Sequence, residues 1–471
     1  MIDHLVDRPR FWPVILVVVR VVPLTARTRY ALLLCGLVKF AIPIVRVPVE
    51  AVPPMRRPSP PRRGERENRG MNDAAARYVR LVLAMGEHDA DYVDAYYGPA
   101  AWREEVRAAN APLAKIHEDA VALREDLGAT QRPSEEIDAL RLDYLRRQTD
   151  ALIARAEMLQ GRRMRFDEES KALYDAVAPT HGEDYFRALN AAIEQELPGS
   201  GSLTERVEAF RMQFAIPREK LDAVFSAAID VCREKTADQM ALPVGESFTV
   251  EYVTNKSWSG YNWYKGGFTS LIQVNTDLPI FIDRAIDLAC HEGYPGHHVY
   301  NSLLEKTLVR DRGWVEFSVY ALFSAQSLIA EGSANYGIDV AFPAEERVEM
   351  EKEKLFPAAG LDPSRAGHYY RVYDLVSRSG YAGNEAARRY LDGEFTAEQA
   401  AEWLSTYALM EPARARQRVK FFNQYRSYVI NYNLGKDLVR NYVERRSGGD
   451  AQKRWDVFAE LLASPRLPSG L

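Results

Sequence analysis

The 471-residue sequence predicts a mainly α-helical protein that carries one small β-sheet. Apolar residues recur with helical spacing along most of the chain from Met71 onward, whereas residues 244–276 contain segments that alternate in the manner of β-strands. Hydrophobic residues make up 47% of the chain and charged residues 27%. This is ordinary globular composition, and it excludes collagen-like and wholly disordered proteins.

Helical periodicity dominates the chain before the predicted strands. It predicts helices over 72–87, 101–127, 134–160, 166–178, 182–197, 203–213 and 217–236. In the last of these, apolar residues spaced i, i+4, i+7 and i+11 form a stripe that we expect to pack into the core. The stripe consists of Leu221, Phe225, Ala228 and Cys232. Helices resume at about residue 279, and Thr396 with Gln399 has the spacing of a capping box that starts a late helix.

Two β-rich segments predict the small sheet. Phe248–Val253 alternates between apolar and polar residues, and Phe268–Asn275 is rich in β-branched residues. Turn-like residues at Ser257–Gly260 and the Gly266–Gly267 pair lie between them.

Charge is distributed unevenly along the chain. Residues 1–70 hold thirteen basic residues against five acids, whereas residues 71–471 hold 48 basic residues against 61 acids. The longer part is therefore mildly acidic, which excludes nucleic acid as its partner, because a polyanion needs a basic surface. We expect a basic Pro/Arg-rich leader at 1–70 and one helical unit at 71–471. Within that unit, 71–243 is a helical N-terminal part and 244–471 is a metal-site part.

The leader has three open interpretations. Its apolar stretches, Phe11–Val22 and Ala31–Val45, are each interrupted by a basic residue and a proline, so neither is a convincing transmembrane helix. The leader is a membrane-surface segment, a disordered basic segment or an upstream extension of the reading frame.

Three widely spaced cysteines predict no disulfide framework. We expect a cytoplasmic protein, with membrane association only through residues 1–70, and the sequence makes no prediction of oligomeric state.

The most informative segment is HEGYPGHH, which contains three of the eight histidines, His291, His297 and His298. In a regular helix His297 would lie about 9 Å along the axis and about 120° around it from His291, too far for the two to share a metal. Pro295 and Gly296 lie between them and could bend the chain so that His297 returns within reach. The alternative is a helix that ends at Tyr294, followed by a turn with surface histidines.

A third metal ligand is predicted in the apolar segment 321–340, which carries Glu331 near its middle. The alternatives are an acid at a helix end or a core acid paired with an arginine. Two histidines, one glutamate and an open position are the pattern of a catalytic zinc site, not of a closed structural one. Asn335 and Asp339 share the helix face of Glu331 and could orient an imidazole ligand.

HEGYPGHH at His291–His298, followed by EGSANYG at Glu331–Gly337, resembles the HExxPGHH…EGxA pattern of a large bacterial family, the domain of unknown function 885 family. That pattern is similar to the gluzincin group of zinc metallopeptidases. The resemblance covers 71–471 but not 1–70. It implies a helical metallopeptidase-like domain with the sheet beside the metal-binding helix, and one zinc ion held by His291, His297 and Glu331. Ser333 and Ala334 stand where the commoner form has Trp-Ala. The resemblance therefore implies the metal ligands but not the shape of the pocket.

The resemblance also implies hydrolysis of a peptide substrate. Glu292 would act as general base towards a zinc-activated water and pass the proton to the leaving amine. For the oxyanion, Tyr425, Tyr428 and Tyr432 recur at i, i+3 and i+7, which predicts one helical face, although each tyrosine alone is more often a packing residue. Tyr432 is the first choice because it matches a Tyr-x-x-Gly stretch of the family.

Several further assignments are weaker. Arg426 and His368 are alternative oxyanion donors, His298 lies outside the ligand set, and Cys290 is expected to pack in the core. Strand 268–275 pairs with an extended substrate, as in related metallopeptidases, or is an ordinary edge strand.

Three other functions stay open: a metal-stabilised binding protein without turnover, a zinc amidohydrolase on a non-peptide amide, and a membrane-surface interaction protein that uses residues 1–70.

Overall fold

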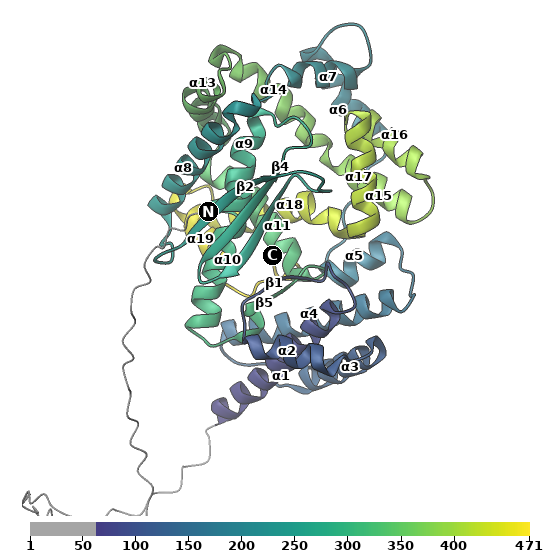
Figure 1. The fold of residues 1–471 in the computed structure, drawn as a ribbon, viewed down its shortest axis with the longest axis vertical. Coiled ribbons are helices and arrows are strands. Elements are labelled where there is room, and N and C mark those ends of the chain that lie inside the picture. The colour runs from purple at the N-terminus through teal and green to yellow at the C-terminus, as the bar shows by residue number, and fades with distance from the viewer. Residues whose placement is uncertain (1–62) are drawn as a thin grey trace, which may run out of the picture. The chain divides into compact units, whose positions relative to one another are not determined.

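Helices account for most of the protein, as the computed structural model shows, and the predicted mainly α class with a small sheet is confirmed (Figure 1). The structure describes residues 63–471, with side chains from residue 70. The predictions for the leader concern residues 1–70 and so lie outside the described residues, except where the first helix begins at Arg63.

The helices before the sheet follow the predicted segments closely. They are α1 (Arg63–Gly86), α2 (Ala100–Ala109), α3 (Leu113–Ala129), α4 (Glu136–Leu159), α5 (Phe166–Tyr174), α6 (Glu183–Glu196), α7 (Leu203–Met212) and α8 (Leu221–Gln239). The predicted helix over 101–127 is in fact two helices, because Asn110 takes a left-handed conformation and Pro112 follows it. The apolar stripe on α8 is buried, as expected.

Eleven helices follow the sheet in the described chain. They are α9 (Ile282–Leu288), α10 (His297–Leu304), α11 (Ala325–Ala341), α12 (Ala344–Met350), α13 (Phe356–Ala359), α14 (Ala366–Ser377), α15 (Tyr381–Leu391), α16 (Ala397–Tyr407), α17 (Pro412–Tyr425), α18 (Ile430–Ser447) and α19 (Ala451–Leu462). The capping box of Thr396 and Gln399 starts α16, which confirms that prediction.

The main sheet has three strands, β2 (Ser247–Val253), β3 (Gly260–Gly266) and β4 (Thr269–Asn275), in the order β2-β4-β3. β2 runs parallel to β4 and β3 runs antiparallel to it. β4 is therefore the central strand, so both interpretations of segment 268–275, as a substrate-pairing strand and as an edge strand, are wrong. Its two edges are taken by β2 and by β3, and β3 was not predicted because turn-forming residues flank it.

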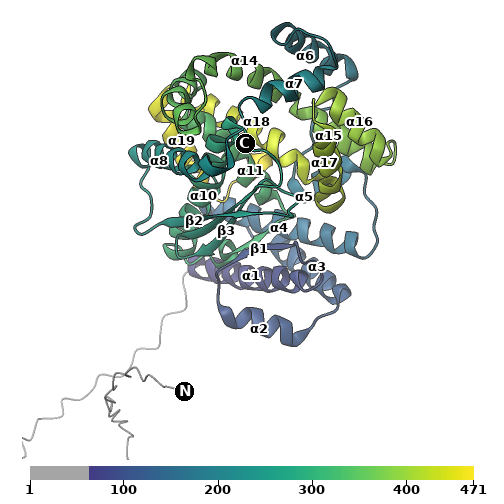
Figure 2. The same ribbon diagram turned by 45° about the horizontal axis from the view of Figure 1, so that its top comes forward.

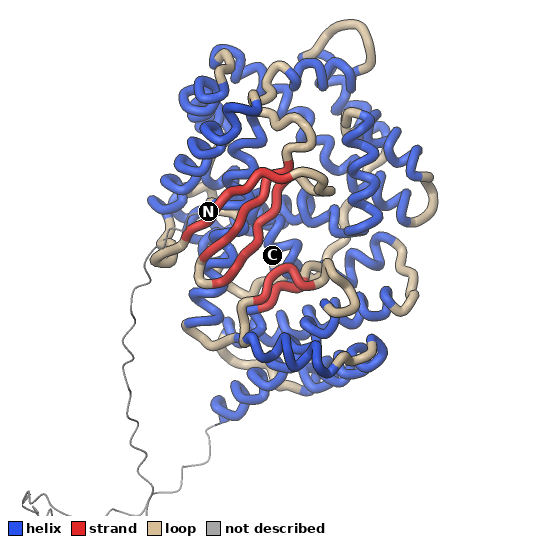
Figure 3. Tube along the Cα trace, viewed as in Figure 1, coloured by secondary structure: helices blue, strands red, loops and turns tan. Residues whose placement is uncertain are grey.

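A second, two-stranded sheet joins distant parts of the chain, since β1 (Val93–Tyr96) pairs antiparallel with β5 (Val319–Ala321). Figure 3 shows both sets of strands in the midst of the helices, and Figure 2 shows the same arrangement from a second direction. The described residues pack into two apolar clusters, and α11 contributes Ile329 to one and Leu328 to the other. α11, which carries Glu331, therefore lies between two cores.

Candidate metal centre

The chain between the two histidines is bent as the sequence predicts. α9 is followed by a π-helical turn at Ala289–Gly293, and a short non-helical segment separates this turn from α10. The amide of Gly296 donates to the carbonyl of Cys290 over 2.9 Å, and a Cβ at Gly296 would lie 1.9 Å from the carbonyl oxygen of His291. Only glycine fits this close backbone contact. It turns the first residue of α10, His297, back towards His291.

The imidazoles of His291 and His297 are mostly buried and face each other. Their Nε2 atoms are 3.2 Å apart, and the side chains are only 13% and 12% exposed. The alternative of a plain turn with two surface histidines after Tyr294 is therefore wrong, because His297 is mostly buried and His298 is fully buried.

Glu331 completes a three-residue cluster. Its Oε2 lies 3.3 Å from Nε2 of His291 and 3.8 Å from Nε2 of His297. Zinc bonds of about 2.0–2.2 Å in a tetrahedron place ligand atoms about 3.3–3.6 Å from one another. These three atoms have nearly that spacing already. Oε2 is buried and has no hydrogen-bond partner among the described residues, so the cluster fits a cation that accepts two imidazoles and one carboxylate.

Two neighbouring side chains orient the cluster. Nδ1 of His291 lies 3.1 Å from the side-chain oxygen of Asn335, which accepts a hydrogen bond from Nδ1–H and leaves the lone pair of Nε2 free for a metal. The Tyr428 hydroxyl donates to Oε1 of Glu331 over 2.8 Å, which leaves Oε2 to face the imidazoles. The prediction that Asn335 contacts an imidazole is thus confirmed. Asp339 instead pairs with Lys436 and Arg440, at 3.0 Å and 2.9 Å.

The charges within the cluster are strongly coupled. Burial favours the neutral form of His297, but the contact with the carboxylate of Glu331 outweighs burial and raises the pKa of His297 to about 9. Burial likewise opposes ionisation of Glu331, yet its contacts with His291 and His297 hold its pKa well below its usual range. Glu331 is therefore ionised, and a metal that binds here displaces a proton from His297.

Strand β3 positions Glu292. The Asn262 side chain donates to the backbone carbonyl of Glu292 over 2.6 Å, and the absence of a side chain at Gly260 makes room for the Glu292 carboxylate. Burial raises the pKa of Glu292, and the neighbouring imidazoles of His291 and His297 oppose that rise. Glu292 is only 4% exposed, and its carboxylate is more basic than that of an ordinary glutamate.

A large cavity of about 1740 Å³ reaches the cluster. His291, Glu292, His297 and Glu331 all line it, and so does Tyr432, so the five predicted site residues share one cavity. The prediction of one continuous helical face for the three tyrosines is wrong, because a 3-10 turn at Arg426–Val429 separates α17 from α18. All three nevertheless line the cavity. Burial, together with the negative charge of Glu331, holds the pKa of Tyr432 well above its usual value, so its hydroxyl keeps its proton.

The weaker candidates lie elsewhere. Arg426 is paired with Glu169 at 2.6 Å, and His368 lies 3.6 Å from Glu196, away from the cavity wall. His298 is fully buried between Ser270 and Glu246, outside the cluster as expected. Cys290 is buried in the apolar core, which confirms its expected packing.

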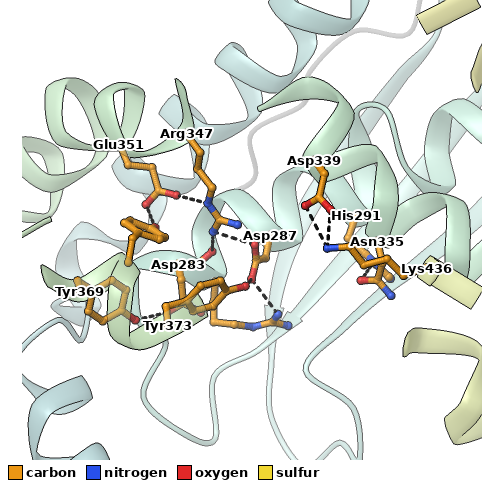
Figure 4. A network of polar contacts seen from close by, with 12 residues as sticks. Asp283, Asp287, His291, Asn335, Asp339, Arg347, Glu351, Tyr369, Tyr373 and Lys436 are labelled. Atoms are coloured by element: carbon orange, nitrogen blue, oxygen red, sulfur yellow. Dashed lines mark hydrogen bonds and ion pairs between the residues drawn. The ribbon is translucent and has the colours of Figure 1, made fainter. Parts of the chain in front are cut away.

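A buried polar network holds α9, the helix that leads into the π-helical turn with His291 (Figure 4). Asp287 on α9 pairs with Arg347 at 2.9 Å and accepts from Tyr373 at 3.0 Å, and Asp283 accepts from Tyr369. Arg347 also pairs with Glu351 at 2.9 Å. These contacts fix α9 against α12 and α14, so that His291 is delivered from a rigid support.

Sequence reasoning missed two side chains close to the cluster. Asp94 on β1 accepts from Tyr261 and lines the cavity, and burial raises its pKa to about 6. Arg418 on α17 also lines the cavity. Neither residue belongs to a motif, and neither lies near HEGYPGHH or EGSANYG in the sequence, so no local signal marks them.

Comparison with known proteins gives distant likenesses only. No protein-family model matches the chain, and no curated protein matches it. Among solved structures it is similar to a protein from Colwellia psychrerythraea proposed to be a lipoprotein, with 17% identity and a TM-score of 0.48 over 75% of this chain and 64% of the other. It is also similar to metallocarboxypeptidase 1 of Trypanosoma cruzi, with 14% identity and a TM-score of 0.43 over 84% and 90% of the two chains.

A third similar structure is a protein of unknown function from Shewanella oneidensis, also proposed to be a lipoprotein. It has 12% identity and a TM-score of 0.41 over 76% and 75% of the two chains. At such TM-scores these likenesses carry no argument about function, which rests on the residues of the site. Among the helices of residues 63–471, none combines the length and the apolar character that crossing a bilayer requires.

Proposed function

We propose that the protein is a zinc-dependent hydrolase that cleaves peptide bonds, with His291, His297 and Glu331 as the zinc ligands. The observation that carries this proposal is the convergence of their three donor atoms, at 3.2, 3.3 and 3.8 Å, on one wall of a large cavity. A zinc ion bound there supplies Lewis acidity to a scissile carbonyl and to a water molecule.

Glu292 has the properties of the general base. It is next to His291 in the chain, lines the same cavity and has a raised pKa because it is buried. It takes a proton from the attacking water and delivers it to the nitrogen of the leaving amine, which completes hydrolysis. Tyr432 keeps its hydroxyl proton and lines the same cavity, so we assign it the donor role towards the oxyanion.

The test combines metal content with turnover of the full-length protein. We expect one zinc per chain, and we expect His297→Ala to lose it. Glu292→Gln should keep zinc and lose cleavage of a mixed peptide library by at least about 100-fold, the usual contribution of a general base. A protein that purifies without metal would overturn the ligand assignment, and undiminished turnover by Glu292→Gln would remove Glu292 from the mechanism.

The same experiment separates the other functions. A metal-stabilised binding protein would hold zinc but cleave no amide, and an amidohydrolase would cleave simple acyl amides but no peptide. Two observations favour peptide hydrolysis: the extent of the cavity around the cluster and the number of polar groups on its wall. Membrane association through residues 1–70 and a cytoplasmic location stay proposals from the sequence.

A further inference from the structure

The charged side chains on the cavity wall are mostly neutralised by neighbours. Arg284, for example, pairs with Asp287 at 3.5 Å, and Arg440 pairs with Asp339 at 2.9 Å. Arg414 and Arg418, one turn apart on α17, have no carboxylate partner within residues 63–471. Of these two arginines, Arg414 donates a hydrogen bond to the backbone carbonyl of Pro279 over 3.1 Å.

The side chain of Arg418 donates no hydrogen bond to any other residue of the described chain. Its guanidinium carbon lies 4.5 Å from the ring centre of Phe421 and 5.6 Å from that of Tyr432. The rings hold the guanidinium in place, but they provide no oxygen or nitrogen acceptor for its five N–H donors. Burial lowers the pKa of Arg418, and the negative charge of Glu331 only partly offsets that effect. Arg418 is half-buried and lines the cavity, so its unpaired N–H donors are available to an anion that enters the cavity.

Two tyrosine rings connect Arg418 to the metal cluster. The ring of Tyr432 lies 5.9 Å from the ring of Tyr428, whose hydroxyl donates to Glu331. Arg418 therefore lines the same cavity as the metal ligands, and the two neighbouring rings of Tyr432 and Tyr428 lead from its guanidinium to Glu331. Successive residues of an extended peptide are about 3.3–3.6 Å apart, so the terminal carboxylate lies about one such step beyond the last peptide carbonyl.

From this geometry we infer that Arg418 binds the free α-carboxylate of a peptide's last residue, which makes the enzyme a carboxypeptidase. The planar guanidinium matches a carboxylate with two parallel hydrogen bonds, which a neutral carboxamide cannot reproduce. Hydrolysis then breaks the last C–N bond and adds water, releasing the terminal amino acid with a free amine and a shortened peptide with a new carboxylate. This inference rests on the proposed function.

The opposite end of a peptide has a less suitable partner in the cavity. Recognition of a free α-amine needs an available carboxylate, and Asp94 is the acid on β1 that faces the cluster. Its carboxylate already accepts a hydrogen bond from Tyr261. Arg418 is therefore the freer of the two groups, and removal of residues from the amino end becomes an outcome of the test.

The experiment uses the zinc-loaded full-length protein and two matched libraries of N-acetylated hexapeptides with a varied last residue. One library ends in a free carboxylate and the other in a carboxamide. We expect kcat/KM to be at least about 100-fold higher for the free acids, because an unpaired charge in the site rejects the amide. Arg418→Gln should lower kcat/KM for the acids by a similar factor and change it less than about threefold for the amides. Arg418→Lys should restore part of the preference, since it restores the charge but not the planar fork.

Binding provides a second measurement that does not depend on turnover. In a Glu292→Gln background, we expect fluorescently labelled acids to bind more tightly than amides, and we expect Arg418→Gln to abolish the difference. Arg416→Gln is the matched control, because Arg416 lies on the same helix but is exposed, and it should leave the preference unchanged. Zinc content and thermal unfolding of each variant verify that the site is intact.

The outcomes are distinguishable. Equal cleavage of acids and amides, or an unchanged preference in Arg418→Gln, overturns this inference and leaves the proposed peptide hydrolysis standing. Cleavage restricted to peptides with a free amine overturns it in favour of the amino end. Carboxamides ending in glutamate that are cleaved as well as free acids would assign Arg418 to a side-chain carboxylate instead. Cleavage of no peptide at all overturns the proposed function itself.

Discussion

Gly332 of α11 and Gly435 of α18 meet backbone to backbone. A Cβ at Gly332 would lie 2.4 Å from the carbonyl carbon of Gly435, and a Cβ at Gly435 would lie 3.0 Å from the Cα of Gly332. The two helices therefore cross in direct contact. This crossing also brings Tyr432, one turn before Gly435 on α18, beside Asn335 on α11. The Asn335 side chain donates to the Tyr432 carbonyl over 3.1 Å.

Gly435→Ala should separate these helices. The added methyl group would lie 2.7 Å from the carbonyl oxygen of Leu328, which is backbone and cannot move aside cheaply. We expect a loss of about 1–3 kcal/mol in the free energy of unfolding, measured by denaturant titration, together with reduced turnover. Gly383→Ala is the control, because a Cβ there has no heavy atom within 4 Å in the described structure. It should be neutral or stabilising by up to about 1 kcal/mol.

The glycines show how far the sequence predicts this site. EGSANYG and the Tyr-x-x-Gly stretch are both visible as motifs, and each contains one glycine of the crossing, Gly332 or Gly435. The motifs predict that these segments belong to the site, and the ligand residues follow from their chemistry. The contact between the two glycines joins segments about 100 residues apart, and no periodicity or local spacing encodes such a contact.

The sheet shows the same limit from another direction. The alternation in β2 and β4 predicts both strands, whereas β3 has a glycine at each end, and these glycines indicate turns and not a strand between them. Its role depends on tertiary contacts: Asn262 holds the backbone of Glu292, and Gly260 leaves space for the carboxylate. Helices are predicted well here because their periodicity is local, and strand order is not, because pairing is decided between segments.

Asn335 should control metal affinity without being a ligand. It accepts from Nδ1 of His291 and so keeps Nε2 directed at the cluster. We expect Asn335→Ala to weaken zinc binding by about 10–100-fold, the usual effect of losing such a support, as measured by competition with a chromogenic chelator. Asp339→Asn is matched to it, because Asp339 lies one turn further along α11 and pairs with Lys436. An equal loss in both variants would contradict an orienting role for Asn335.

Glu351 should make stability depend on pH. Burial raises its pKa to about 7, although the ion pair with Arg347 and the hydroxyl of Tyr370 oppose that rise. The folded protein therefore holds the Glu351 proton more tightly than the unfolded chain does. Its contribution to stability is fully present below about pH 4.5, the usual pKa of glutamate, and is lost as the pH rises through about 7.

The comparison with Glu351→Gln isolates this effect, since glutamine does not titrate. Relative to the variant, the wild-type protein should lose stability between pH 4.5 and 7, by about 3 kcal/mol at most. Urea titrations at several pH values measure the difference. Glu349→Gln provides the control, because Glu349 is exposed and its ion pair with Lys352 lies at the surface. A stability difference for Glu351→Gln that stays constant across this range would show that Glu351 is ionised throughout.

Gly296 should decide whether zinc can bind at all. Any side chain there would meet the carbonyl oxygens of His291 and Cys290, at 1.9 and 2.4 Å, so Gly296→Ala must open the bend that returns His297 to the cluster. In the wild-type protein, free zinc at 100 times its dissociation constant should stabilise the fold by about 2.7 kcal/mol, and a chelator should remove that gain. Gly296→Ala should show no zinc-dependent gain while retaining its helical circular dichroism, whereas Gly383→Ala should respond to zinc like the wild type. A full zinc response in Gly296→Ala would mean that the bend is not what assembles the ligands.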